Sequence, residues 1–253
     1  MKTQATCASL LITALLPLLQ ADPPEPREID PAKGRVTEDG RFEPAGKPDE
    51  SPQPTPDPAK RLAELGIDVT EKAFRIGSVE LDRETMMVTI PATVNMIEGA
   101  CEYFLVHRSG KVHESIFTTD AKAQDIHIAC LLAGWKPGEK AVEIEIHVTW
   151  ETNGPPRRHR AEELAAFAQG HPKASNGGTL EQGPWQYIGS VTDAAGFAAA
   201  REGSFISLII DPTSLIGNPR PGRKDDSLHV PNRDLLPAVG HPVRIVISKP
   251  EKN

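Results

Sequence analysis

The chain of 253 residues predicts an α+β fold: a mostly antiparallel sheet with one well-marked buried helix and one short helix, in a single domain. Three observations predict it. Runs of alternating apolar and polar residues recur between residues 61 and 253, as expected of half-buried strands. One segment, Ala121–Ala133, is bounded by residues that start and end helices. Strands and helices do not alternate regularly, which argues against a doubly wound nucleotide-binding fold.

Residues 1–21 resemble a secretory signal peptide. Lys2 is followed by a mostly apolar run, Ala8–Leu19, and polar residues begin at Asp22. The run is shorter than the roughly 20 apolar residues that span a bilayer, so we expect no transmembrane helix in the mature chain. The protein is therefore expected to be exported, either to the periplasm or out of the cell, with cleavage near Ala21.

Residues 22–60 predict a disordered, proline-rich, acidic tether. Ten of the 24 prolines lie in this segment, together with ten acidic and six basic residues. Such a composition buries too little apolar surface to offset the entropy lost on ordering. Residues 61–253 remain as one domain with 25 acidic and 21 basic residues, a balance that argues against nucleic acid as a partner.

The strands are predicted from period-2 patterns and the turns between them. Ser109-Gly110 separates two runs within residues 102–118, which predicts a hairpin with a two-residue turn. The predicted strands are Ala73–Val79, Met86–Thr93, Glu102–Arg108, Lys111–Thr118, Ala141–Thr149, Trp185–Val191, Gly203–Asp211 and Pro242–Ser248.

The helix Ala121–Ala133 is expected to start at Asp120 as its N-cap and to end at Gly134. Its second half is apolar nearly all round, so it should be buried against the sheet. His127 is the polar exception. A shorter helix is predicted over Ala161–Gln169.

Cys101 and Cys130 are the two thiols left once a signal peptide containing Cys7 is removed. In an oxidising compartment they can form one disulfide, which requires Cα atoms within roughly 7 Å. They can equally be buried free thiols that pack as small apolar side chains.

Four segments together resemble the YdjY-domain family of exported bacterial proteins. They are Ile90-Pro-Ala-Thr-Val-Asn95, the run Glu102-Tyr-Phe-Leu-Val, Gly110-Lys-Val-His-Glu-Ser115, and Asp125-Ile-His-Ile-Ala. The C-terminal part, with Trp185, Gly189-Ser190 and Asp211-Pro212, is similar too. The likeness covers roughly residues 74–250. It implies a domain boundary and the place of a site, and it carries over no activity and no catalytic residue.

Pairing the predicted hairpin through its turn places His113 opposite Val106 and Glu114 opposite Leu105. Because neighbours along a strand point to opposite faces, His113 and Glu114 should not share a ligand. His107 would then lie with Glu114 on one face, and His113 among apolar residues on the other.

The buried helix adds His127 and Cys130 to this picture. If it covers one face of the hairpin, His127 can meet His113, with Cys130 nearby; if it covers the other, His127 meets His107 and Glu114. Two imidazoles with a third ligand suit zinc or another transition metal. The candidate metal ligands are therefore His113, His127, Glu114 and Cys130. A structural role for the same side chains is the competing interpretation.

Other chemical motifs are weaker. Neither Gly189-Ser190 nor Gly203-Ser204 has the flanking pattern of a nucleophile elbow. The cluster Arg157-Arg158-His159-Arg160 resembles an anion-binding element, and a solvated loop after Pro155-Pro156 is the alternative.

Three functions are consistent with these patterns, and the sequence leaves open whether the protein is an enzyme. The first is an exported binding or accessory module of the cell envelope, whose partner is an envelope protein or a small ligand. The second is a metal-binding protein or metal-dependent enzyme with a His-centred site between hairpin 102–118 and helix 121–133. The third is a structural envelope protein.

Overall fold

The structure is a computed structural model that describes residues 66–138, 140–171 and 178–250, the helix at 58–64, and short strands at 35–36 and 42–43. The chain divides into two units, Met1–Glu64 and Leu65–Asn253. The expected signal peptide lies outside the described residues, as does most of the expected tether.

In the first unit, β1 (Arg35–Val36) pairs antiparallel with β2 (Phe42–Glu43), and α2 covers Pro58–Glu64. No helix within the described ranges is long and apolar enough to span a bilayer.

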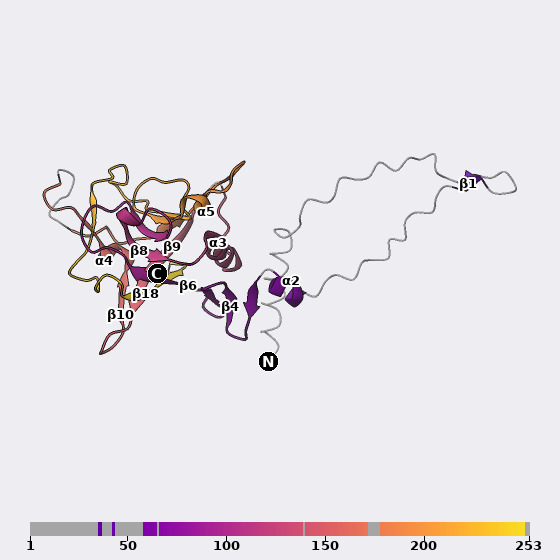
Figure 1. Ribbon diagram of the computed structural model, residues 1–253, viewed down its shortest axis with the longest axis horizontal. Helices are drawn as coiled ribbons and strands as arrows, with labels where there is room; N and C mark the ends of the chain where they lie inside the picture. The colour runs from indigo at the N-terminus through magenta and orange to yellow at the C-terminus, as the bar shows by residue number, and fades with distance from the viewer. Residues whose placement is uncertain are drawn as a thin grey trace. The chain divides into compact units, whose positions relative to one another are not determined.

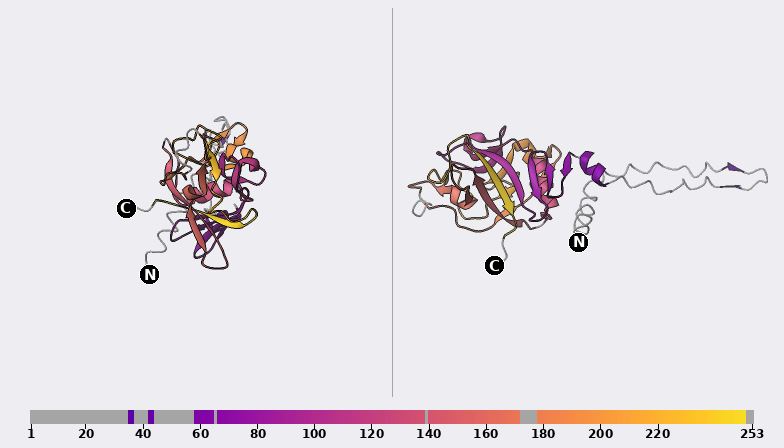
Figure 2. Two further views of the ribbon diagram at one scale, coloured as in Figure 1. Left: turned by 90° about the vertical axis from the view of Figure 1, so that its left-hand side faces the viewer. Right: turned by 90° about the horizontal axis from the view of Figure 1, so that it is seen from below.

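The second unit is mostly β, built on an eight-stranded mixed barrel rather than an open antiparallel sheet (Figures 1 and 2). Its closed circuit runs β9-β12-β16-β15-β7-β8-β6-β18 and returns to β9. These strands are β6 (Val88–Val94), β7 (Tyr103–His107), β8 (Ser115–Thr119), β9 (Val142–Trp150), β12 (Trp185–Tyr187), β15 (Ser204–Ser207), β16 (Ile216–Gly217) and β18 (Pro242–Ser248).

Further strands extend the barrel wall or form separate ribbons. β3 (Ile67–Val69), β4 (Ala73–Ile76) and β5 (Val79–Asp82) continue outward from β6, and β10 (Arg157–Arg160) pairs with β9. Two ribbons lie apart from this sheet: β11 (Ala165–Phe167) with β17 (His229–Pro231), and β13 (Thr192–Asp193) with β14 (Gly196–Phe197).

The core fills the barrel, as expected at this strand number. Alternate residues of β9, from Ile144 to Trp150, are buried, while the residues between them face outward and are at least partly exposed. Among the largest fully buried side chains are Trp135, Trp185, Tyr103, Tyr187, Phe104, Phe117 and Phe205. The mixed barrel corrects the expected α+β sheet, because closure joins strands that are distant in sequence.

The predicted hairpin 102–118 is wrong. β7 and β8 run parallel, with Tyr103 opposite Ser115 and Leu105 opposite Phe117. Only residues 108–114 connect them, and this segment includes the 3₁₀ helix η2 (Val112–Glu114). Each strand has a second neighbour on its other edge, β15 beside β7 and β6 beside β8.

The main helix is α3 (Ala123–Leu132), which packs against β4, β5 and β6. Its C-cap is Ala133, and Gly134 follows it with a φ of 81°, as expected of a glycine that ends a helix. Its N-cap is Lys122 and not Asp120, whose carboxylate instead pairs with Arg108 at 2.5 Å. Two shorter helices are α4 (Ala161–Leu164) and α5 (Ala198–Glu202).

Other expected elements are shorter or divided. The strand predicted over Ala73–Val79 turns at Gly77 and becomes β4 and β5. The helix predicted over Ala161–Gln169 stops at Leu164, and the chain continues as β11, which pairs with β17. In contrast, β18 has the bounds that its alternating pattern predicts.

Candidate functional site

His113 and Glu114 lie next to each other in η2. The His113 side chain is 78% exposed, and its Nε2 lies 3.6 Å from Glu114 Oε2. The two side chains meet because they lie in a helical turn, where the alternation of a strand does not apply. The expectation that they point apart is therefore wrong.

His127 and Cys130 belong to α3 and have different neighbours. His127 Nδ1 lies 2.7 Å from Tyr187 Oη, and its ring centroid is 5.2 Å from that of Phe197. Burial lowers the pKa of His127 and raises the pKa of the fully buried Cys130 thiol. Cys130 and Cys101 are both free and buried. A protonated thiol in an apolar setting is a poor ligand and a poor nucleophile.

The predicted metal ligands do not assemble into one site. Within the described ranges, no three or more His, Cys, Asp or Glu side chains are placed to hold a metal ion. The alternative partner, His107, contacts Ser109 Oγ through Nδ1 at 2.7 Å and packs against Phe205. Because β7 and β8 form no hairpin, the geometry that would have brought the imidazoles together is absent.

The segment does assemble a smaller polar group around Lys111. Lys111 Nζ donates to Tyr103 Oη at 2.5 Å, and that hydroxyl donates to Asp211 Oδ2 at 3.0 Å. Burial raises the pKa of nearby Glu102, and the negative charge of Glu114 raises it further. This group ties the connection 108–114 to the turn at Asp211 and so has a structural role.

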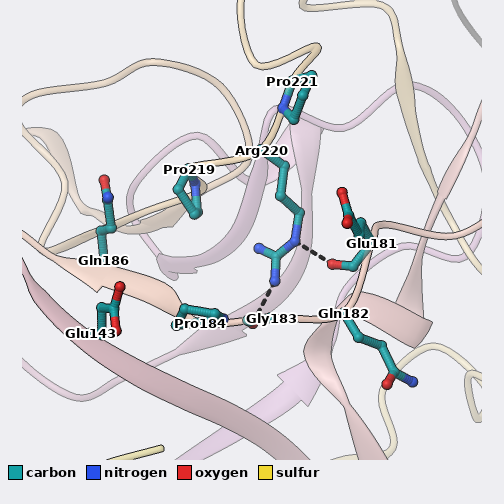
Figure 3. Close-up of a pocket in the computed structure, with 9 residues that line it drawn as sticks. All are labelled: Glu143, Glu181, Gln182, Gly183, Pro184, Gln186, Pro219, Arg220 and Pro221. Carbon is teal, nitrogen blue, oxygen red and sulfur yellow. Dashed lines mark hydrogen bonds between the residues drawn. The ribbon is translucent and has the colours of Figure 1, made fainter.

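A pocket of about 270 Å³ lies elsewhere, where β12 begins and β16 ends (Figure 3). It is lined by Glu143, Glu181, Gln182, Gly183, Pro184, Gln186, Pro219, Arg220 and Pro221. Glu143 and Gln186 are directly opposite on β9 and β12, so their side chains share the outer face of the barrel. In Figure 3 they lie on one side of the pocket, with Glu181 and Gln182 on the other.

Arg220 forms a fixed part of the pocket wall. Its Nε donates to the Glu181 carbonyl, and its Nη2 donates to the Gly183 carbonyl at 2.6 Å and to Glu162 Oε1 at 3.0 Å. The guanidinium also stacks over Trp185, 5.1 Å from the ring centroid. Glu162 is fully buried and compensates the charge of Arg220.

The pocket therefore presents acidic and amide groups to a ligand. Glu143 and Glu181 are exposed, and neither carboxylate makes an ion pair or hydrogen bond with another of the described residues. Its volume lies just below the range of about 300–1,000 Å³ typical of small-molecule sites. The pocket suits a single side chain or a compact polar group.

Sequence reasoning missed this pocket because its walls come from separate segments. Residues 181–186 and 217–221 are brought together by the antiparallel pairing of β12 with β16, and β9 supplies Glu143. Proline and glycine at 183–184 and 219–222 signal turns. They do not indicate which turns meet.

The comparisons with known proteins concern the barrel unit. The family model of the YdjY domain matches residues 79–248, which include every strand of the closed circuit and all the residues of the pocket. No curated protein and no solved structure matches the chain. The match extends over more than half of the sequence and agrees with the resemblance at residues 90–130. The chain belongs to the YdjY-domain family.

Proposed function

We propose that the protein is an exported binding module and that its pocket takes a basic side chain of an envelope partner. The observation that supports this proposal is a pair of exposed carboxylates, Glu143 and Glu181, that line a small pocket. The positive charge of Arg220 in the same pocket is already compensated by Glu162. A cation entering the pocket would meet two carboxylates and the amides of Gln182 and Gln186. An anion would meet repulsion from both carboxylates.

The fixed position of Arg220 in the pocket wall favours a site that is formed before the ligand binds. Arg220 is 7% exposed and uses its donors on groups from three segments, so the part of the wall that it forms is held in place without ligand. A preformed site loses less conformational entropy when it binds. This supports recognition of a partner by a fixed surface.

The test is a titration of the full chain, followed by NMR, with N-acetyl-lysinamide and its uncharged analogue N-acetyl-norleucinamide. We expect the lysine compound alone to shift the resonances of pocket residues, with an affinity that falls as salt increases. Glu143→Gln and Glu181→Gln should each weaken binding by about threefold, because an exposed ion pair contributes up to about 1 kcal/mol.

Glu84→Gln is the matched control, since Glu84 is also exposed but does not line the pocket. It should leave the affinity unchanged. Equal binding of the two compounds would contradict the proposal, as would equal weakening by the control.

Export is part of the proposal and has its own test. Cleavage near Ala21 would leave an N-terminus close to Asp22. Cell fractionation with N-terminal sequencing of the mature chain checks this. An uncleaved chain in the cytoplasmic fraction would contradict it.

A further inference from the structure

The arginine cluster at residues 157–160 lies in strand β10, and the strand separates its side chains. β10 pairs antiparallel with β9, with Arg158 opposite Thr149 and Arg160 opposite His147. On the other side of β9, β18 places Arg244 opposite the same Thr149. Residues directly opposite in neighbouring strands project to the same face. Arg158, Thr149 and Arg244 therefore form one row across three strands.

This row lies on the outer face of the sheet. In β9 the buried residues include Val148 and Trp150, whereas Thr149 lies between them and is partly exposed. Arg158 is exposed, and the Arg244 side chain is 65% exposed. The β9–β10 hairpin extends beyond the barrel at the bottom of Figure 1.

The arginines differ in how much of their charge is compensated. Arg160, one row away, contacts Glu145 and Glu162, each at 3.4 Å. Arg158 makes no ion pair within the described ranges, and Arg244 has only an exposed contact with Glu151 at 3.7 Å. Two guanidinium groups thus flank a threonine hydroxyl with little compensating negative charge.

His147 is the next outward residue of β9 and indicates how concentrated the positive charge is. Burial lowers the pKa of His147, and the charges of Arg158 and Arg160 lower it further, while those of Glu145 and Glu162 partly offset the effect. Its Nδ1 is buried, with no hydrogen-bond partner in the part of the chain that the structure describes. A bound anion would offset the repulsion among these groups.

We propose that Arg158, Thr149 and Arg244 bind an oxyanion, a phosphate or sulfate group. Opposite Cβ atoms are about 5 Å apart, so the two arginine Cβ atoms lie roughly 10 Å apart, and both long side chains can reach an anion above Thr149. Guanidinium groups bind such oxyanions with paired hydrogen bonds. This site is separate from the acidic pocket and does not depend on the function proposed for it.

The test is a titration of the full chain with inorganic phosphate and with sulfate, followed by NMR. Arg158→Gln and Arg244→Gln should each weaken binding about tenfold, the loss expected for a hydrogen bond to a charged group. Glu151→Gln should strengthen binding, because it removes the carboxylate that competes for Arg244.

Arg157→Gln is the matched control. Arg157 lies in the same strand and is exposed, but it is opposite Trp150 and projects to the other face. This variant loses the same charge and should keep its affinity. Equal weakening by the control, or a dissociation constant above about 10 mM for both anions, would overturn the proposal.

Vesicles distinguish two sources of the phosphate. Phosphatidylglycerol vesicles are compared with phosphatidylcholine vesicles, with and without free phosphate. Binding to the anionic vesicles that free phosphate displaces and Arg158→Gln abolishes identifies a lipid headgroup. Binding to free phosphate without vesicle binding identifies a soluble phosphate compound. Vesicle binding that Arg158→Gln leaves intact would count against the site.

Discussion

At the scale of single residues, the domain contains several buried or partly buried histidines and one buried ion pair. His127, His147 and His229 all have pKa values below that of an exposed histidine, with burial as the main cause. Arg220 and Glu162 form a buried ion pair behind the pocket. Because these groups are held wholly or partly away from water, protonating one of these histidines or removing one partner of the ion pair should lower the stability of the fold.

His229 predicts a loss of stability in acid. It is fully buried, neither ring nitrogen has a hydrogen-bond partner among the described residues, and burial lowers its pKa to about 4. Between that value and about 6.5 the unfolded chain binds a proton that the folded chain does not. Stability is therefore full above pH 6.5 and falls as the pH drops toward 4, by about 3 kcal/mol.

Urea unfolding at a series of pH values checks this, with His229→Leu as the test variant. The variant should lose much of the pH dependence between about 6.5 and 4, leaving the part due to His127 and His147. His113→Asn is the control, because His113 is exposed. An unchanged slope in His229→Leu would show that another group is responsible.

The Glu162–Arg220 pair predicts a large cost for removing one partner. Glu162→Gln leaves the buried guanidinium without its countercharge, which costs about 3–5 kcal/mol. The exposed pair Arg75–Glu80 provides the control, and Glu80→Gln should cost at most about 1 kcal/mol. Thermal or urea unfolding measures both. Similar costs for the two variants would mean that the Glu181 and Gly183 carbonyls and the Asn218 side chain suffice to hold Arg220.

At the scale of elements, the most unusual feature is the short connection between the parallel strands β7 and β8. Parallel neighbours usually need a crossover of a dozen or more residues, and here residues 108–114 suffice. The connection is possible because Gly110 packs on Gly203, at the end of α5. A Cβ on Gly203 would lie 2.9 Å from Gly110 Cα, and the Gly203 carbonyl accepts from His107 N at 2.8 Å.

Gly203→Ala should therefore destabilise the domain more than a comparable glycine substitution. Gly203 has φ of 68°, and Gly134 has φ of 81° with open space around it. Gly134→Ala should cost about 1–2 kcal/mol for the left-handed backbone, and Gly203→Ala about 1–3 kcal/mol beyond that for the clash. Urea unfolding compares them. Equal costs would indicate that the connection shifts freely.

The sequence predicts individual elements better than their pairing. The alternation in residues 242–248 gave the bounds of β18, and Gly134 marked the end of α3, because both signals are local. β10 was not predicted, since four basic residues show no apolar alternation, and pairing with β9 forms that strand. The pair β7–β8 was predicted antiparallel because a local pattern contains no information about long-range neighbours.

At the scale of the whole molecule, β18 closes the barrel. It pairs with β6 along one edge and with β9 along the other, so residues near the C-terminus join two strands that are more than forty residues apart (Figure 2, right). Closure leaves these strands no open edge, which protects them from pairing with other chains.

A chain ending at Gly240 should therefore fail to form the native barrel. Without β18, the facing edges of β6 and β9 are exposed, and the buried Val243, Ile245 and Ile247 are lost from the core. We expect aggregation, measured by size-exclusion chromatography, and loss of cooperative unfolding. A chain ending at Lys249 keeps all of β18 and serves as the control. A soluble, cooperatively folding chain ending at Gly240 would show that the barrel does not need closure.

The sequence by itself determined the family, the apolar alternation of the longer strands and a single main helix, because these depend on residues close together in the chain. Only the tertiary structure decided that the sheet closes, that β7 and β8 run parallel, and that the predicted ligands His113, His127, Glu114 and Cys130 do not assemble into one metal site within the described ranges. It also decided where like charges lie close together: the carboxylates of Glu143 and Glu181 at the pocket, and Arg158 of β10 and Arg244 of β18 on either side of Thr149 in β9. Both groups of charges arise because strands from distant segments pair with one another. The register of that pairing is fixed by the free energy gained when the strands bury a shared core.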